Sequence, residues 1–328
     1  MLRARSAIPP VGHESFYSMN ETRPRTLPLT AIDPDRRWSL HQDLTQSPDG
    51  QFLARVKTYG ILRPPLVQQL DQHRYQLVCG SLRLKALELL DRRETTCLVL
   101  APSLSFSQLL DIVARDQADR GLLTPIEAAR LILMSRENTT DDAELWHRVT
   151  GVANRGHLMR LPHLLKLEPH LREQIHRGVI SARTGLLLTS LASDDRLFLG
   201  ELFEQLEIND NKQQRVIDWV RIIATTENRS FRELFTDRYG YCVALDSSAN
   251  RPQIVQRLLQ DLQRHSHPRL SRAQREFEER LTALHLPHHC RVTPGTSFES
   301  DRVTLSVDLP SLDRLEALWP SLQSLLHP

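Results

Sequence analysis

Glycine and aromatic residues are scarce in this sequence. Only 12 of the 328 residues are glycine and 5% are aromatic, which argues against a glycine-rich nucleotide enzyme and against a β-sandwich. Leu, Arg, Gln and Glu recur instead in periodic runs, and such a composition favours helices. A chain of 328 residues is too long for one small core, so we expect two or three domains.

Paired cysteines and long apolar runs are also lacking. The four cysteines (Cys79, Cys97, Cys242 and Cys290) lie far apart and follow no CxxC spacing, which predicts reduced thiols, as in a cytosolic protein. The first ten residues are basic but lack the apolar stretch of a signal peptide, and no run approaches 18 apolar residues. We therefore expect a soluble, cytoplasmic protein with no membrane partner.

The net charge is small, because 42 basic and 40 acidic residues nearly cancel to +2. Their distribution is uneven, however. Between residues 143 and 190, seven Lys or Arg stand against three Glu, a net charge of +4 in 48 residues, with five histidines in addition. Binding to nucleic-acid phosphates requires local positive charge of this kind. A basic surface that faces only solvent would have the same composition. The order of the surrounding helices and strands is therefore needed to distinguish it from a nucleic-acid-binding surface.

The first third of the chain mixes strands and helices. Residues 1–26 carry three prolines and several arginines without apolar periodicity, which predicts a flexible arm. Residues 27–122 alternate short strands with helices and predict a small mixed α/β domain. In this domain we expect strands at 65–67, 75–79 and 97–100, and helices at 52–59, ending at Gly60, and at 82–90.

Residues 123–237 have a helical apolar period throughout. Thr124, Pro125 and Glu127 form the pattern of an N-cap, a first-turn proline and a first-turn acid. Short helices joined by tight glycine turns follow, which is typical of a helix-turn-helix domain rather than of a long bundle. The expected short helices are 144–149, 155–161 after an Asn154 cap, 171–177, and one that runs from a Ser181 cap to 187.

A small unit closes the chain, after a predicted linker at 238–270. Residues 271–328 are expected to form helix, strand, strand and helix, with Val303, Leu305 and Val307 on one face of the second strand. We expect Pro320 to kink or end the last helix. A unit of 58 residues buries too little apolar surface to be comfortably stable alone. We therefore expect it to pair with a second copy, making the chain a homodimer.

Short motifs accompany this order of elements. Residues 60–64 read GILRP, 75–83 read YQLVCGSLR and 116–120 read DQADR. Together with segment 164–183 and the C-terminal unit, they resemble the ParB family of partition proteins, whereas residues 191–270 match least. The resemblance implies a multidomain α+β protein: a small ParB/sulfiredoxin-like α/β domain that binds nucleotide, an all-α helix-turn-helix domain and a small αββα dimerisation domain.

ParB proteins bind CTP with Mg²⁺ through the motifs G-E-R-R and E-N-x-Q-R. Here Ser81 replaces the acid and Leu82 replaces one arginine, a bidentate phosphate donor worth about 1.5–3 kcal/mol. The start of the following helix could still receive a phosphate on its N–H groups. Two interpretations stay open: CTP binding, with weak CTP hydrolysis as its extension, and a degenerate module kept for its fold. The implied nucleotide-binding residues are Arg36, Gly80, Ser81, Arg83, Asp116, Gln117 and Arg120.

The predicted DNA contacts lie mostly on the helix that follows the Asn154 cap. Asn and Arg are the residue types that read adenine and guanine edges, and a helix N-terminus meets phosphate. Gly156 and Pro162 make this helix short. Arg183 belongs to a helix that also faces DNA in ParB proteins. The alternative is idle surface charge, and the predicted contacts are Asn154, Arg155, His157, Arg160 and Arg183.

A histidine-rich run precedes Cys290. His285, His288, His289 and Cys290 are spaced too closely for a tetrahedral zinc site, and no second ligand pair follows. We therefore predict no metal site there. We also predict no catalytic residue, because no paired carboxylates lie near a convincing metal site.

Three functions are open to a chain with these features. The favoured one is a site-specific DNA-binding protein of chromosome or plasmid partition. By resemblance it would load at a palindromic centromere-like site, slide as a CTP-gated clamp, work with a ParA-type ATPase and lie on the nucleoid. The second is a ParB-like transcriptional regulator or silencer without the nucleotide switch, which the altered GSLR run favours. The third is a nuclease on the same fold, which DNA cleavage dependent on Asp116 would support.

The DNA-binding prediction can be tested at two arginines. Arg155→Ala or Arg160→Ala is expected to weaken specific DNA binding by about 1–3 kcal/mol where the side chain contacts a base edge. Fluorescence anisotropy with a site-bearing duplex measures this loss. Unchanged affinity in both variants would mean that the recognition helix lies elsewhere in the chain.

Overall fold

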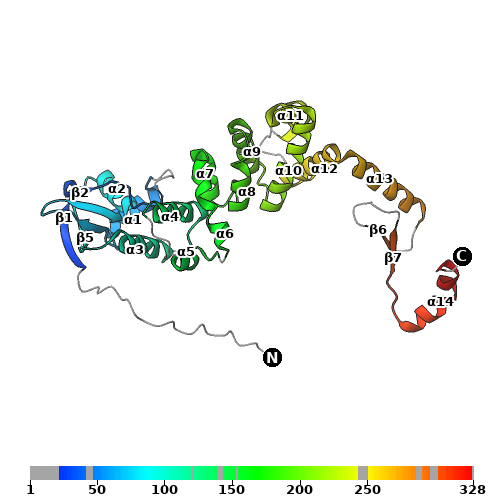
Figure 1. The fold of residues 1–328 in the computed structure, drawn as a ribbon, viewed down its shortest axis with the longest axis horizontal. Coiled ribbons are helices and arrows are strands. Elements are labelled where there is room, and N and C mark those ends of the chain that lie inside the picture. Colours follow the sequence, from blue (N-terminus) through cyan, green and yellow to red (C-terminus); the bar gives the residue numbers. More distant parts are fainter. Residues whose placement is uncertain are drawn as a thin grey trace. The chain divides into compact units, whose positions relative to one another are not determined.

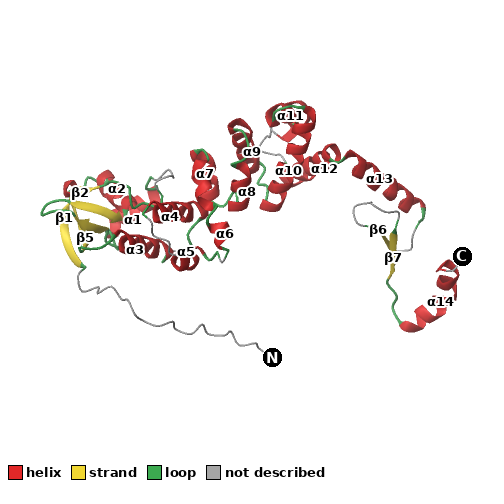
Figure 2. Cartoon of the chain, in the orientation of Figure 1, coloured by secondary structure: helices red, strands yellow, loops and turns green. Residues whose placement is uncertain are grey.

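The computed structural model divides the chain into two compact units, Met1–Gly200 and Glu201–Pro328 (Figure 1). Helices dominate both units. Strands form one sheet in the first unit and one hairpin in the second (Figure 2). The chain is therefore a mixed α/β protein, and the finer domain boundaries given above stay predictions. The structure describes residues 22–41, 47–119, 121–138, 143–152, 154–242, 250–285, 290–295 and 302–326.

The sheet of the first unit has five strands in the order β1-β5-β3-β4-β2. The outer pairs are β1 with β5, antiparallel, and β2 with β4, parallel. In the middle, β3 runs antiparallel to β4 and parallel to β5. The sheet is thus mixed, with parallel and antiparallel pairs, inside the mixed α/β domain that the alternation of strands and helices predicts. Its strands are β1 (Arg23–Pro28), β2 (Ile32–Asp33), β3 (Leu66–Gln69), β4 (Tyr75–Cys79) and β5 (Glu94–Leu100).

One expectation for the N-terminal arm is wrong. The sequence assigns residues 23–26 to a flexible arm, but they form most of β1 and pair with β5. Prolines and exposed charges are what an edge strand carries to discourage further pairing, and they hid the strand in the sequence. Arg25 fixes this edge to the sheet, because its Nη1 donates to the Tyr75 hydroxyl over 2.7 Å.

The core of this sheet is closed by two helices, α1 (Gly50–Tyr59) and α2 (Ser81–Leu89). Val67, Tyr75 and Cys97 of the strands lie in one cluster with Val56 of α1 and Leu84 of α2. Burial raises the pKa of the Cys97 thiol to about 11, so this thiol is inert at neutral pH. The described cysteines are all free of disulfides.

Helical elements follow the sheet along the chain, up to α9, which crosses the boundary between the two units at Gly200, and α4 is the helix on which five of them meet. It has eight buried residues and contacts α3, α5, α6, η3 and α7. The predicted start of α4 is confirmed: Thr124 and Glu127 form a capping box, with Pro125 in the first turn. The elements are α3 (Phe106–Ala118), α4 (Pro125–Glu137), α5 (Ala143–Thr150), α6 (Arg155–Leu158), η3 (Leu161–Lys166), α7 (Pro169–His176), α8 (Ala182–Leu188) and α9 (Ser193–Gln205).

The second unit begins with a helical cluster. The segment expected to be a linker, 238–270, contains α12, whose Val255, Leu258 and Leu262 are buried, and α12 packs on α10. Tyr239 and Tyr241 add hydrogen bonds to His265 and Asp261 of α12, at 2.7 and 2.8 Å. The elements of the cluster are α10 (Asp210–Glu227), α11 (Phe231–Arg238), η4 (Gly240–Cys242) and α12 (Arg251–Ser266).

The C-terminal order helix, strand, strand, helix is as predicted. It consists of α13 (Pro268–Ala283), β6 (Cys290–Pro294), β7 (Val303–Val307) and α14 (Leu312–Leu326). β6 and β7 are antiparallel, and Val303 and Leu305 are about half exposed. Pro320 does not end the last helix, because α14 continues through it. None of the described helices is long and apolar enough to cross a membrane.

A half-buried ion pair joins Glu168, the N-cap residue of α7, to Arg196 of α9 within the first unit. Arg196 Nε lies 3.0 and 2.9 Å from the two Glu168 carboxylate oxygens, and its Nη2 lies 2.7 Å from Oε1. The Ser193 hydroxyl donates to the same Oε1 over 2.6 Å. The hydrogen bonds from Arg196, the main cause, lower the pKa of Glu168 to about 2.

This ion pair should make stability depend on pH. The pKa of Glu168 is depressed on folding, so its contribution is full above about pH 5 and is lost as the pH falls toward 2. We expect Glu168→Gln to lower the urea midpoint of unfolding at pH 7, and the deficit to shrink between pH 5 and pH 3. Arg196→Gln serves as the partner control and should behave in the same way. A deficit independent of pH would contradict this account.

Candidate DNA interface and anion cavity

The candidate DNA-binding segment starts at a glycine turn. α5 ends at Gly151, whose φ of +69° lies in the left-handed region that glycine tolerates best. Asn154 then caps α6, with its side-chain oxygen accepting from the His157 N–H over 3.1 Å. Asn154 was predicted as a DNA contact. In the structure its side chain holds the first turn of α6 in place and remains exposed.

The predicted helix 155–161 is not continuous. α6 covers only Arg155–Leu158, and the chain continues as the 3₁₀ helix η3, Leu161–Lys166. Pro162 lies in the first turn of η3. There its missing N–H leaves no hydrogen bond unmade, whereas inside an α-helix it would remove one. The proline therefore helps to divide the predicted recognition helix into two short elements, α6 and η3.

Burial along this segment has a period of three residues. In a 3₁₀ helix, side chains at i and i+3 lie above one another, so every third residue shares a face. One face is apolar and packs inward, against α4 and α8, which η3 contacts. The opposite row is basic and exposed. The buried row is Leu158, Leu161, Leu164 and Leu167, and the exposed row, called here the basic row, is Arg160, His163 and Lys166.

Sequence reasoning missed two members of this row. Of the basic row, only Arg160 was predicted to contact DNA. The leucine repeat at a spacing of three could have predicted the basic row. A search for the α-helical period of 3.6 residues does not detect that repeat. Arg155 and Arg183 are exposed, as predicted, and Arg183 lies at the start of α8, whose cap Ser181 accepts from the Thr184 N–H. His157 is only half exposed.

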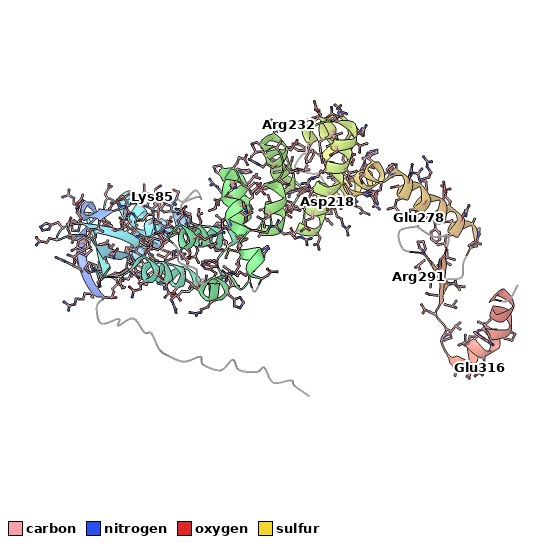
Figure 3. All side chains as sticks on the ribbon, in the orientation of Figure 1. Lys85, Asp218, Arg232, Glu278, Arg291 and Glu316 are labelled. Atoms are coloured by element: carbon pink, nitrogen blue, oxygen red, sulfur yellow. The ribbon has the colours of Figure 1, made fainter. Side chains whose placement is uncertain are left out.

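A second candidate site is a cavity of about 140 Å³ in the first unit. It lies between the turn after β2 and the start of α2. Arg36 and Ser81, both predicted nucleotide contacts, line it together. Lys85 lines it as well, one helical turn after Ser81, and Glu88 follows one turn later. Lys85, labelled in Figure 3, was not predicted; its spacing of four from Ser81 was the available signal.

The cavity lining carries a net positive charge, which suits an anion. Arg36 and Lys85 supply two cations from two different elements, against the single carboxylate of Glu88, and the first turn of α2 opens on the cavity at Ser81 and Leu82. Arg36 is itself held, since its Nη2 donates to the His41 carbonyl over 2.6 Å. Pockets for whole small molecules have volumes of about 300–1,000 Å³. This cavity is therefore of a size for phosphate groups rather than for a complete nucleotide.

Arg83 and Asp116 belong to a different cluster. The Arg83 guanidinium is buried, with Nη1 donating to the Pro64 carbonyl over 3.3 Å and Nη2 3.9 Å from Asp116 Oδ2. On the other side, Arg63 Nη2 lies 3.6 Å from Asp116 Oδ1 and 2.6 Å from Asp119 Oδ2. The structure therefore separates Arg83 and Asp116 from Arg36 and Ser81.

None of the remaining predicted nucleotide residues that the structure describes lines the cavity. Gly80 starts α2 with a φ of +109°, and an added Cβ would lie 3.2 Å from Pro65 and from Arg83 Nη1. Gln117 follows Asp116 on α3 and is half exposed. Arg120 lies outside the described residues.

Magnesium does not fit the residues assigned to it. Two guanidinium groups already face the Asp116 carboxylate, whereas Mg²⁺ in a nucleotide site takes one or two carboxylates whose charge is available to it. Among the described residues, no group of three or more His, Cys, Asp or Glu side chains could hold a metal ion. His288 and His289 of the histidine-rich run lie outside the described residues.

A polar network connects the turn beside the cavity to α7. His41 Nε2 lies 2.5 Å from Glu127 Oε1, and the Thr124 N–H donates to Glu127 Oε2 over 2.7 Å. The Thr124 hydroxyl in turn lies 2.9 Å from His176 Nδ1, in the last turn of α7. Burial alone would raise the pKa of Glu127, but the bonds from His41 and Thr124 outweigh it and lower that pKa.

No family model matches the sequence. Among characterised relatives, a nucleoid occlusion protein of Geobacillus thermodenitrificans is 22% identical over 212 residues, 64% of this chain and 69% of that protein. The chromosome-partitioning protein Spo0J of Thermus thermophilus is 29% identical over 184 residues, 55% of this chain and 65% of that protein. Over more than half of its length the chain is therefore similar to ParB-type proteins.

Solved structures give a weaker comparison. The C-terminally truncated chromosome-partitioning protein ParB of Caulobacter crescentus, crystallised with the centromeric parS site, is 19% identical. The match covers 58% of this chain and 96% of that one, with a TM-score of 0.34. The same protein complexed with CTP-γ-S gives a TM-score of 0.24. These scores are too low for a comparison of individual sites.

Arg83 can be tested as a structural residue. Arg83→Gln removes the buried guanidinium group that faces the Asp116 carboxylate, and we expect a loss of about 2–3 kcal/mol in the free energy of unfolding. Arg63→Gln, at the half-exposed partner, should cost less than about 1 kcal/mol. Urea denaturation measures both. Adding Asp116→Asn should restore at least half of the Arg83→Gln loss, and no recovery would contradict the ion-pair account.

Proposed function

We propose that this ParB-type chain binds double-stranded DNA at specific sites and acts in the partition of a chromosome or plasmid. The observation that carries the proposal is the basic row Arg160, His163 and Lys166, exposed on a segment whose leucines anchor it from below. Positive side chains held on a rigid element are what contact with phosphates and base edges requires. Segment 143–183 then serves as a helix-turn-helix module, with α6 and η3 together as its recognition element.

Site-specific DNA proteins of this kind read palindromes as dimers. The C-terminal α13, β6, β7 and α14 supply the dimerisation module in this proposal, because Val303, Leu305 and Trp319 are about half exposed in the single chain. Pairing with a second copy would cover them. A protein of this function lies on the nucleoid and works with a ParA-type ATPase.

The anion cavity gives the first unit a nucleotide-responsive role. The phosphates of CTP would lie against Arg36, Ser81 and Lys85, and closure around them would gate a sliding clamp. A regulator that lacks the nucleotide switch is the second candidate. It is favoured by Arg83, which is committed to the buried cluster with Asp116, and by apolar Leu82 on the cavity wall. Binding of CTP separates the two candidates.

DNA binding is tested by sequencing the genomic fragments that the purified chain retains. The partition proposal predicts one or a few palindromic sites with binding that spreads around them, whereas scattered promoters without spreading would refute it and favour the regulator.

Lys166→Ala should lower the slope of log affinity against log salt by about 0.9 if the side chain meets a phosphate. Lys57→Ala, at an exposed lysine of α1, is the matched control and should leave the slope unchanged.

Nucleotide binding is tested at Lys85. We expect Lys85→Gln to weaken CTP binding at least tenfold in equilibrium dialysis, because the cavity loses one of its two cations, while DNA affinity without nucleotide stays the same. Lys57→Gln removes the same charge elsewhere and should have no effect. If the wild-type chain retains palindromic DNA but binds no CTP, the regulator is the function and the clamp is excluded.

A further inference from the structure

The anion cavity is rich in cations and poor in carboxylates. Arg36 and Lys85 line it from two elements, and among the described residues Glu88 is the one carboxylate in its lining. Glu88 is also distant from the start of α2, because the helix rises about 10 Å between Ser81 and Glu88. Lys85 stands between them, one helical turn from each, so Glu88 has a lysine beside it on the same face of α2.

A site for a complex of magnesium and phosphate needs a different lining. Mg²⁺ takes oxygen ligands in near-ideal octahedral geometry, and beside phosphates the protein usually contributes one or two carboxylates. Such carboxylates repel the phosphate when no metal is bound, so the metal is what joins the two negative partners. In the anion cavity a phosphate meets Arg36 and Lys85 directly. These two cations repel any divalent cation that approaches with the phosphate.

The carboxylate that the family resemblance assigns to the metal is committed elsewhere. Asp116 does not line the cavity, and it is buried between Arg63 and Arg83, whose Nη2 atoms lie 3.6 and 3.9 Å from its two oxygens. Arg83 is buried as well and also donates to the Pro64 carbonyl. Turning Asp116 toward a metal would leave the Arg83 guanidinium without this counter-charge, and an uncompensated buried charge is strongly unfavourable.

We propose that the anion cavity binds phosphate groups that carry no divalent cation, and that Mg²⁺ competes with the protein for the ligand instead of assisting its binding. The inference rests on the proposed function, in which the cavity receives the phosphates of CTP, and it names the form of the nucleotide that binds. Mg²⁺ on a phosphate chain cancels negative charge that Arg36 and Lys85 attract. It also occupies oxygens to which these two side chains would donate hydrogen bonds.

This preference makes free Mg²⁺ a regulator of the site. A nucleoside triphosphate or a pyrophosphate binds Mg²⁺ through neighbouring phosphates, whereas a single inorganic phosphate has no second phosphate to share the metal. Occupancy of the cavity by CTP therefore falls as the concentration of Mg²⁺ rises, and occupancy by inorganic phosphate does not. Comparing the two ligands separates an effect of Mg²⁺ on the ligand from an effect on the protein.

The test uses the full wild-type chain and equilibrium dialysis with CTP. Binding is measured in EDTA and with Mg²⁺ in excess over CTP, at an ionic strength matched with KCl. We expect binding to be about fivefold weaker with Mg²⁺, the factor that corresponds to losing one contact between unit charges in water. Equal or tighter binding with Mg²⁺ would overturn the inference and leave the nucleotide role of the cavity in place.

Pyrophosphate and inorganic phosphate serve as probes that lack a base and a sugar. Mg²⁺ should weaken the binding of pyrophosphate by a similar factor and leave the binding of inorganic phosphate unchanged. Equal losses for both probes would overturn the inference, since Mg²⁺ would then act on the protein. If pyrophosphate behaves as expected but CTP binds in neither buffer, the inference stands and the CTP-gated clamp fails. If neither pyrophosphate nor CTP binds in EDTA, the inference and the nucleotide role of the cavity both fail.

Two variants locate the effect in the cavity. Asp116→Asn removes the carboxylate that the resemblance assigns to the metal, and we expect the same CTP affinity as in the wild type in both buffers, because Asp116 lies outside the cavity lining. Lys85→Gln removes a cation of the lining, so both the CTP affinity and its dependence on Mg²⁺ should fall. Circular dichroism verifies folding, and a folded Asp116→Asn chain that loses CTP binding would overturn the inference. If that variant does not fold, the wild-type comparison of EDTA with Mg²⁺ decides.

Discussion

The arrangement of the first unit depends on the bonds that the buried carboxylate of Glu127 makes. It lies at the start of α4, the helix on which the surrounding helices meet, and it receives bonds from the Thr124 backbone and from His41. His41 stands in the turn that also holds Arg36 of the anion cavity. Thr124 reaches His176 at the end of α7. One negative charge thus joins the strand-rich part of the unit to the helices that carry the candidate DNA interface.

The second constraint is volume. The four leucines of the buried row fill the space under α6 and η3, and Gly185 of α8 allows this close approach, since an added Cβ would lie 2.9 Å from Leu164. The basic row is therefore a consequence of packing. Once every third residue is a buried leucine, one of the two rows between them is half-buried and the other, the basic row, lies at the surface. The ten residues 158–167 therefore stabilise the fold and, in the proposed function, also contact DNA.

Local signals in the sequence were read correctly, and contacts between distant residues were not. The strand Tyr75–Cys79 and the capping box of α4 follow from neighbouring residues and are confirmed. The ion cluster of Arg83 depends on Asp116, 33 positions later, and His41 meets Glu127 across 86 positions. The local sequence pattern does not predict such pairs. Pro162 indicated where the helix ends, but the leucine repeat at a spacing of three is missed when the sequence is searched for the α-helical period of 3.6 residues.

The 3₁₀ geometry of η3 sets the spacing of its exposed side chains. A 3₁₀ helix rises about 2.0 Å per residue, against about 1.5 Å in an α-helix. The six residues of η3 therefore extend about a third further than six α-helical residues would. If η3 meets DNA as proposed, its basic side chains are spread over a longer stretch of the duplex than the same side chains on an α-helix would be. A change of backbone geometry alone would then put them out of register with their contacts, with every side chain unchanged.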